Sequence, residues 1–324
     1  MRCLGIESTA HTFGVGIVDS QGKALADARD MYIPKKGWGI IPTEAAQHHE
    51  RVRKKVLEEA LKEAKLEMKD SDVIAYSEGP GLAPCLHKGL ALAQELSEQY
   101  KKPLVGVNHL IGHIEIAKLQ TGLKDPITLL TTGANNQIAA FVSGRYRLFG
   151  ETMDVGVGNA LDKFGREVGL DFPAGPKIEA LATKGTYTEL PYVVKGMDLS
   201  FSGILTAALN KVKQGAKLED VCFSLQETFF AMMVEVTERA MAHTGKEELI
   251  LTGGVAQNAR LTEMLTIMCR ERQARFAVCP KKYCGDNGVM IAWLGLLAHK
   301  ARKKTKKPAL YPRQRIDEVE VGWL

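Results

Sequence analysis

The chain has 324 residues, of which 45% are apolar and 25% charged, and its formal net charge is +5. This composition is ordinary for a soluble globular protein, and the length suits two lobes better than one. The longest apolar runs, such as GVMIAWLGLLA, are too short to span a bilayer, and no apolar stretch of signal-peptide length precedes Glu7. We therefore expect a cytoplasmic protein.

A pattern near the start of the chain recurs about 125 residues later. Residues 4–27 are predicted to form a strand, a small-polar turn, a second strand, another turn and a third strand. Residues 129–151 repeat this order with nearly the same lengths. Two copies of one supersecondary unit predict two similar lobes that face each other.

The rest of the chain alternates predicted strands and helices, which indicates α/β lobes with helix-covered sheets. Strands are expected at 72–81, 103–110, 248–254 and 275–280. Helices are expected over Leu86–Tyr100, around His113, from Gln257 through Arg272, and from about Asn287 to Ala301.

His109 and His113 lie four residues apart in a helix-compatible apolar run, NHLIGHIEI. Side chains at i and i+4 point the same way if the helix already includes the first of them. The metalloprotease signature H-E-x-x-H has a general-base glutamate between its histidines, whereas Leu110, Ile111 and Gly112 intervene here. The pair is a candidate for metal binding without indicating a protease, and a structural role stays open.

Asp286 precedes the last predicted helix, in YCGDNGVMIA. Aspartate is a good helix N-cap, and Gly-Asp-Asn is typical of turns. Asp286 would equally complete a His/His/carboxylate site, because a catalytic metal needs three protein ligands and open positions.

Other potential ligands favour structural roles. Adjacent His48 and His49 diverge by about 100° on a helix, so we expect both on the helix surface. The six cysteines show no C-x-x-C spacing, and the closest pair, Cys279 and Cys284, lacks a standard zinc-ligand spacing. Buried thiols are the expected outcome.

Two glycine-rich strand ends are candidate nucleotide contacts. TTGAN (131–135) and TGGVAQN (252–258) each follow an apolar strand, and the second is expected to open a helix whose N-terminal amides suit an anion. Neither matches a P-loop or a dinucleotide-binding fingerprint. Together with the repeated hairpins, they predict a nucleotide clamped between two lobes.

The segment 299–315 carries eight lysines and arginines. Such a basic tail would neutralise the phosphates of a polyanion in a salt-dependent way, or would contact a partner subunit. A solvated basic terminus is the alternative, and the sequence leaves both open.

In combination, these motifs resemble one family over nearly the whole chain: the archaeal and eukaryotic-type catalytic subunit of the KEOPS complex, a TsaD-like tRNA N6-adenosine threonylcarbamoyltransferase. The resemblance is carried by GIESTAHTFGVGIV, SEGPGL, VGVNHLIGHIE, MDVGVGNALDKFGREVGLDFPAGPKIEALA, KGMDLSFSGIL, SLQETFFAMMVEVTERA, LTGGVAQNARL and CGDNGVMIAW. It implies the α/β fold of actin, Hsp70 and sugar kinases, with two ribonuclease-H-like lobes around a nucleotide cleft. It assigns residues 1–125 and 286–324 to lobe I and residues 126–285 to lobe II.

The resemblance also implies a set of site residues. One metal ion per subunit, iron or zinc, would be held by His109, His113 and Asp286. The adenosine part of the substrate would be contacted by Asp162, Gly175, Glu179 and Asn258. Its phosphate and acyl group would be cradled by Leu130, Thr131, Thr132, Gly133 and Ala134. Glu7 and Asp162 are candidates for the general base.

Two positions depart from the family pattern. Archaeal members often have a tyrosine ligand where this chain has Leu130, but bacterial-type members have an aliphatic residue there, so the site is expected to function without it. The family's SGGN is TGAN here. If Ala134 takes a positive φ, its Cβ adds strain that glycine avoids.

The family activity implied is transfer of the threonylcarbamoyl group from threonylcarbamoyl-AMP to N6 of adenine 37, in tRNAs that read codons starting with A. The tRNA would bind through its anticodon stem-loop. Expected protein partners are a small kinase-like ATPase, a dimerising subunit and accessory subunits, and ATP- or AMP-type nucleotides would fit the cleft. The alternative is a non-enzymatic, nucleotide-gated regulatory ATPase, because a fold does not fix a function. Such an ATPase has no need of the His/His/Asp set.

Overall fold

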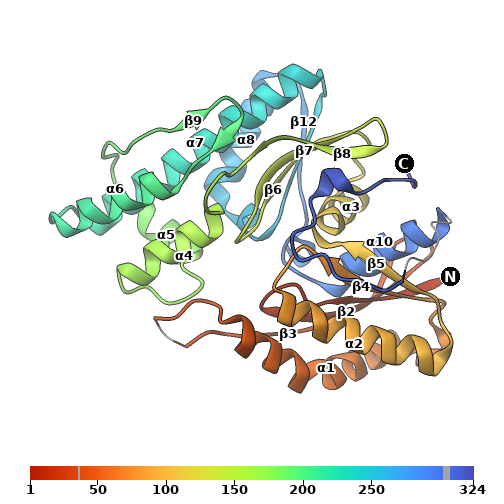
Figure 1. Ribbon diagram of the computed structural model, residues 1–324. Helices are drawn as coiled ribbons and strands as arrows, with labels where there is room; N and C mark the ends of the chain where they lie inside the picture. Colours follow the sequence, from red (N-terminus) through yellow and green to blue (C-terminus); the bar gives the residue numbers. More distant parts are fainter. Residues whose placement is uncertain (36, 302–306) are drawn as a thin grey trace.

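Two five-stranded mixed sheets form the framework of the computed structural model, which describes residues 1–35, 37–301 and 307–324 (Figure 1). The first sheet has the order β3-β2-β1-β4-β5, from β1 (Arg2–Glu7), β2 (Thr12–Asp19), β3 (Ala24–Met31), β4 (Val73–Gly79) and β5 (Leu104–Asn108). The second has the order β8-β7-β6-β11-β12, from β6 (Ile127–Thr131), β7 (Asn136–Val142), β8 (Arg145–Glu151), β11 (Glu248–Thr252) and β12 (Arg275–Val278).

The two sheets share one connectivity. In each sheet, the first three strands pair antiparallel. The fourth strand then pairs parallel with the first, and the fifth pairs parallel with the fourth. The strands predicted from the repeated pattern are β1–β3 and β6–β8, and the later predicted strands correspond to β4, β5, β11 and β12. The prediction of two similar lobes is therefore confirmed by the strand order.

Helices cover both faces of each sheet. On the first sheet, α1 (Pro42–Ala64) and α2 (Ala83–Tyr100) pack on one face and α10 (Gly288–Lys300) on the other. Next to α10, α3 (His109–Thr121) packs against the second sheet, whose other face contacts α7 (Leu218–Thr244). The remaining elements are η1 (Met68–Asp70), α4 (Val157–Glu167), α5 (Gly175–Ala182), β9 (Val194–Lys195), β10 (Asp198–Leu199), α6 (Ser202–Lys213), η2 (Gly254–Gln257), α8 (Ala259–Glu271), α9 (Lys281–Cys284) and η3 (Ile316–Glu318).

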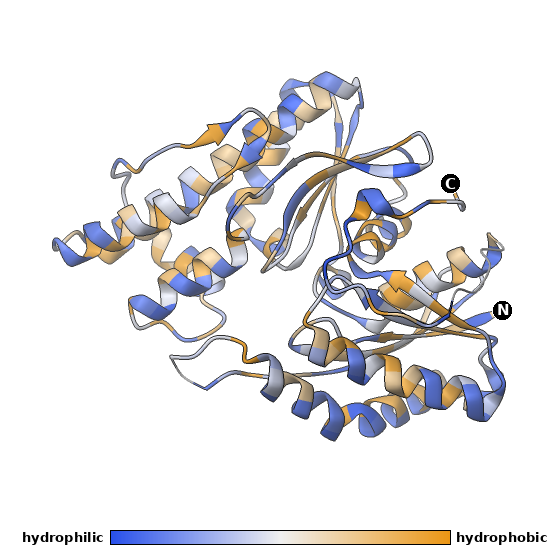
Figure 2. Ribbon diagram, viewed as in Figure 1, coloured by the Kyte–Doolittle hydropathy of each residue, from blue (hydrophilic) through white to orange (hydrophobic). Residues whose placement is uncertain are grey.

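Burial of the helices follows their composition. The outer surface of α1 is largely hydrophilic, whereas hydrophobic residues concentrate on the strands and on helix faces turned toward them (Figure 2). In contrast, α3 is buried at every position from His109 to Ala117, as expected for a helix that is apolar nearly all round. Among the described residues, no helix is both long and apolar enough to cross a membrane.

Helix α10 lies directly on the backbone of the first sheet because glycines line the contact. A Cβ on Gly5 would lie 2.1 Å from the amide nitrogen of Ala292, and one on Gly16 would lie 2.2 Å from that of Val289. These distances are far below normal carbon–nitrogen contacts. The close approach fixes the start of α10 at the end of the first sheet, beside α3.

Two predictions about individual elements were wrong. The helix expected from Gln257 begins at Ala259, because Asn258 caps it and the preceding residues form the 3-10 turn η2. His49 is fully buried, with its ring centroid 5.4 Å from that of Phe13, because α1 packs on β2 through this side. Burial lowers the pKa of His49 to about 4.

The described cysteines all have free, buried thiols, as expected. Only part of the predicted basic tail belongs to the described residues. Residues 302–306 lie outside the described residues, and the part from Ala309 onward packs on the protein rather than projecting from it. The backbone N–H of Tyr311 donates to the carbonyl of Glu78 at 2.7 Å, and Arg315 pairs with Glu151 of β8 at 3.1 Å.

Candidate active site

The first turn of α3 directs two histidines toward the same point. Asn108 caps this helix, since its side-chain oxygen accepts the N–H groups of Leu110 at 3.0 Å and Ile111 at 3.1 Å. The helix therefore already includes His109, and His113 lies one turn later on the same side. Their ring centroids are 4.8 Å apart, with the rings nearly perpendicular.

Asp286 comes from the loop that leads into α10. The N-cap of α10 is Asn287, whose side-chain oxygen accepts the N–H of Met290 at 2.9 Å. The loop is also held by Arg29, which donates to the backbone carbonyl of Asp286 at 3.1 Å. Of the two roles left open by the sequence, the N-cap role belongs to the neighbouring residue, and the carboxylate of Asp286 faces the histidines.

The three side chains form one compact cluster. Oδ1 of Asp286 lies 3.3 Å from Nε2 of His113 and 3.5 Å from Nε2 of His109. One ligand atom from each residue can be chosen so that all three lie within 4.8 Å of one another. Two imidazole nitrogens and one carboxylate oxygen are a donor set that suits zinc or iron. The residues present therefore fit a metal ion with open coordination positions.

Glu7 contacts the ring nitrogen of His109 that points away from Asp286. Its carboxylate is fully buried, with Oε2 2.9 Å from Nδ1 of His109 and Oε1 accepting the N–H of Thr9 at 2.7 Å. A carboxylate on one imidazole nitrogen fixes the tautomer and orients the other nitrogen. Glu7 therefore keeps Nε2 of His109 facing Asp286, a role that the sequence alone did not reveal.

The charges in the cluster compensate each other. Burial favours neutral His109, but the carboxylates of Glu7 and Asp286 outweigh this effect and raise its pKa to about 9. Burial also disfavours ionised Asp286, yet His109 and His113 hold its pKa well below the usual range. For His113 burial dominates and lowers the pKa. The cluster thus keeps the partly exposed carboxylate of Asp286 ionised next to two buried imidazoles, as a cation site requires.

The two glycine-rich strand ends lie side by side at one edge of the second sheet. Thr131 donates its hydroxyl to the carbonyl of Thr252 at 3.1 Å. Gly253 has φ +97°, and a Cβ there would lie 2.4 Å from the carbonyl oxygen of Thr131. Only glycine accommodates both the positive φ and this contact. The carboxyl ends of parallel strands β6 and β11 thus present two adjacent loops, as ligand sites in such sheets commonly do.

The predicted phosphate-binding stretch divides into a buried and an exposed part. Leu130 is fully buried in a core cluster that includes Ile111, and Thr131 is also buried. Thr132 is half-buried, and Gly133 and Ala134 are exposed. Ala134 is not among the residues with positive φ, so its Cβ adds no left-handed strain. The contact of this stretch with phosphate and acyl group stays a prediction.

The four residues predicted to contact adenosine converge from three helices. On α4, Asp162 accepts the N–H of Ala174, the residue before Gly175, at 2.8 Å. Space above Gly175 is open, since a Cβ there would meet nothing within 4 Å. One turn further along α5, Glu179 accepts the N–H of Ala259 at 2.7 Å.

Asn258 completes this group at the start of α8. Its side chain accepts the N–H of Leu261 at 3.1 Å and donates to Gln226 at 2.9 Å. In the first turn of α8, the N–H of Ala259 thus donates to a carboxylate and that of Leu261 to the cap, and binding of a substrate anion there stays a prediction. The preceding Gly254 has open space around it instead.

His11 lies in the turn after β1, and sequence reasoning did not single it out as a site residue. It follows β1 in the turn STAHT, where half-buried His11 lies with its ring centroid 6.2 Å from that of Phe172. Burial is the largest influence on the pKa of Asp162 and raises it, while a positive charge on His11 would lower it. The turn was already noted as part of the repeated hairpin, and its polar residues were the available signal.

These two sheets and their helices form an α/β fold of the actin, Hsp70 and sugar-kinase type, with a candidate His–His–Asp metal site beside two glycine-rich loops. Solved structures support the fold alone. HypF from Thermococcus kodakarensis aligns with a TM-score of 0.64 and 16% identity, over 94% of this chain and 48% of that one. A ROK-family glucokinase from Streptomyces griseus, in complex with glucose and AMPPNP, aligns with a TM-score of 0.52 and 15% identity, over 91% and 99% of the chains.

Sequence relatives identify the family within this class. Residues 24–293 match the family described as TsaD, tRNA N6-adenosine threonylcarbamoyltransferase. A protein of that name from Thermococcus sibiricus is 54% identical, with all of both chains covered. The chain therefore belongs to the tRNA N6-adenosine threonylcarbamoyltransferase family, and it is an acyltransferase.

A second relative is longer than this chain. The probable bifunctional tRNA threonylcarbamoyladenosine biosynthesis protein of Methanobrevibacter smithii is 54% identical over 99% of this chain, which spans only 60% of that protein. The remainder of the bifunctional protein has no counterpart in the alignment.

Proposed function

We propose that the protein transfers the threonylcarbamoyl group of threonylcarbamoyl-AMP to N6 of adenine 37, in tRNAs that read codons starting with A. The observation that carries this proposal is the His109–His113–Asp286 cluster, with two buried histidines and a partly exposed aspartate, in a chain of this family. The cluster lies on α3, which packs against β6 and β11, the strands that lead into the two glycine-rich loops. The adjacent loops after β6 and β11, joined by the hydrogen bond from Thr131 to Thr252, support a single cleft for the acyl group and the adenylate.

In the proposed mechanism, His109, His113 and Asp286 would hold a zinc or iron ion. Such an ion supplies Lewis-acid polarisation of the carbamoyl carbonyl. The loop Thr132–Ala134, exposed at Gly133 and Ala134, and the open backbone at Gly254 would face the adenylate phosphate. The adenosine would lie among Asp162, Gly175, Glu179 and Asn258.

The transfer itself forms a bond between N6 of the tRNA adenine and the carbonyl carbon. The bond between that carbon and the phosphate oxygen breaks, and AMP leaves with the electron pair. N6 also loses a proton. Glu7 is buried and occupied by Thr9 and His109, so Asp162 is the better candidate to accept it: Asp162 is partly exposed, and burial raises its pKa. An exocyclic amine is a weak nucleophile, so positioning should supply much of the rate.

The tRNA would present its anticodon loop, where unstacked bases are accessible to proteins. A tRNA substrate also supports action in the cytoplasm. The proposed protein partners are a small kinase-like ATPase, a dimerising subunit and accessory subunits, together forming a KEOPS-type complex. In a relative named bifunctional, the part that aligns with this chain is joined to a further segment. This arrangement supports a second activity that is associated with the transferase.

Nucleoside mass spectrometry tests the proposal. The protein, assembled with its partner subunits, is incubated with threonylcarbamoyl-AMP and unmodified tRNA that carries adenine 37, and with a matched tRNA that carries guanine 37. We expect threonylcarbamoyladenosine from the first tRNA only. No product from either tRNA, combined with ATP hydrolysis by this chain, would contradict the transferase and favour the nucleotide-gated ATPase.

A further inference from the structure

The C-terminal segment, residues 309–323, crosses from the first sheet to the second and passes α3 on the way. Tyr311 lies so close to the end of β4 that a Cβ on Gly79 would meet its carbonyl oxygen at 1.9 Å. Further along, the N–H of Val321 donates to the carbonyl of Gly144, in the turn between β7 and β8, at 3.0 Å. The segment therefore spans both lobes and is fixed on each.

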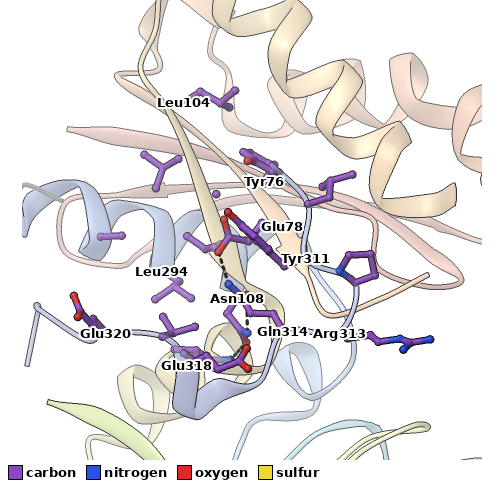
Figure 3. Close-up of a pocket in the computed structure, with 18 of the residues that line it drawn as sticks. Tyr76, Glu78, Leu104, Asn108, Leu294, Tyr311, Arg313, Gln314, Glu318 and Glu320 are labelled. Atoms are coloured by element: carbon purple, nitrogen blue, oxygen red, sulfur yellow. Dashed lines mark hydrogen bonds between the residues drawn. The ribbon is translucent and has the colours of Figure 1, made fainter. Parts of the chain in front are cut away.

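Gln314 in this segment contacts the residue that caps α3. Its side-chain oxygen accepts a hydrogen bond from Nδ2 of Asn108 at 2.9 Å, and its Nε2 donates to Oε1 of Glu78, also at 2.9 Å (Figure 3). An amide that donates through Nδ2 to Gln314 must direct its oxygen the other way, toward the helix N–H groups. Gln314 thus fixes the orientation in which Asn108 caps the turn that begins at His109.

Trp323 contacts α3 on the other side of the histidines. Its Nε1 donates to Oε1 of Glu115 at 2.8 Å, and the hydroxyl of Tyr146 donates to the same oxygen at 2.7 Å. Glu115 is almost fully buried and lies two residues beyond His113. Two side-chain hydrogen bonds from the C-terminal segment therefore bracket the stretch that carries both histidines.

The C-terminal segment does not pack closely against every neighbouring element. A cavity of about 1150 Å³ separates the segment from β5 and α10, and Leu104 and Leu294 are among its lining residues (Figure 3). Between the two polar contacts, Ile316 is fully buried in a core cluster that includes Leu110 and Ile111 of α3, so apolar packing also holds the segment to this helix. Beside this apolar contact, the hydrogen bonds of Gln314 and Trp323 join the segment to the residues on either side of the two histidines.

We propose that the C-terminal segment positions α3, with Gln314 and Trp323 as positioning residues for His109 and His113. This inference rests on the metal site of the proposed function. Metal ligands must be held to within about 0.5 Å of the productive geometry, and residues outside the ligand set typically change metal affinity about 10- to 100-fold. The segment would therefore tune the site without touching substrate or metal.

The test uses Gln314→Leu and Trp323→Phe, which remove the amide and the indole N–H but keep comparable volume. Tyr311→Phe, which removes a hydroxyl at an exposed position in the same segment, is the matched control. Each protein is titrated with Co²⁺, and its visible absorption, melting temperature and steady-state kinetics are recorded. We expect cobalt affinity and kcat to fall about tenfold in the first two variants. We expect no change in the control, in KM for tRNA, or in overall folding.

The possible failures are distinguishable. Equal cobalt affinity and an unchanged cobalt spectrum in the parent and both variants would overturn the positioning role alone. A parent protein that binds no cobalt would overturn the metal site and this inference with it. Because Trp323→Phe keeps the aromatic ring, it remains informative if Gln314→Leu fails to fold.

Discussion

Replacing Asp286 by alanine is expected to lower threonylcarbamoyl transfer by about 10³-fold or more while the protein stays folded. The carboxylate is the one anionic ligand of the cluster, within 3.5 Å of both imidazoles. A metal that polarises a carbonyl stabilises the transition state by several kcal/mol, and each factor of ten in rate corresponds to about 1.4 kcal/mol. Folding should persist because Asn287 caps α10 and Arg29 holds the loop backbone.

His109→Ala should lower transfer to a similar degree. It also leaves the buried carboxylate of Glu7 without its imidazole partner, so some loss of stability is expected with it. Activity is measured as threonylcarbamoyladenosine formed per tRNA, and folding by circular dichroism. Glu271→Ala, which removes an exposed carboxylate on α8, is the control. Retained activity in both site variants would contradict the metal assignment.

Replacing Gly16 by alanine is expected to destabilise the protein by about 3 kcal/mol. The added methyl group would lie 2.2 Å from the amide nitrogen of Val289, so α10 must move away from the first sheet. Since the loop before α10 carries Asp286, the same displacement should weaken metal binding. Both effects have one cause, which is the glycine-lined contact between helix and strands.

The change in the free energy of unfolding is measured from the urea midpoint. Gly203→Ala in α6 is a matched control, because a Cβ there meets nothing within 4 Å and alanine favours helices over glycine by up to about 1 kcal/mol. We expect Gly203→Ala to be neutral or stabilising. Equal urea midpoints for the two variants would show that α10 does not rest on the strand backbone as described.

The sequence predicted the two three-strand units because the repeated hairpins have a clear local pattern. Each copy combines apolar strands with glycine-containing turns, and such local patterns usually agree with the secondary structure of the folded protein. The start of α8 was less predictable, because Asn258 and Gln257 are both compatible with a helix N-terminus. Only the bonds from Asn258 to Leu261 and from Glu179 to Ala259 determine where the helix begins.

In the site, too, some features follow from a local pattern and others do not. The spacing of His109 and His113 predicted a pair on one helix face. Asp286 was named as the third ligand from ligand chemistry and from the family resemblance, whereas its local sequence was equally compatible with an N-cap. The burial of His49 and the support that Glu7 gives to His109 depend on contacts between distant segments. Such tertiary contacts are invisible to a reading based on neighbouring residues.

Anomalous X-ray diffraction from crystals soaked in zinc and in cobalt tests the central claim most directly. The predicted result is one strong peak at each metal's absorption edge, bounded by Nε2 of His109, Nε2 of His113 and the carboxylate of Asp286. No peak at this position, or a peak only at other side chains, would contradict the metal site on which the proposed acyl transfer depends.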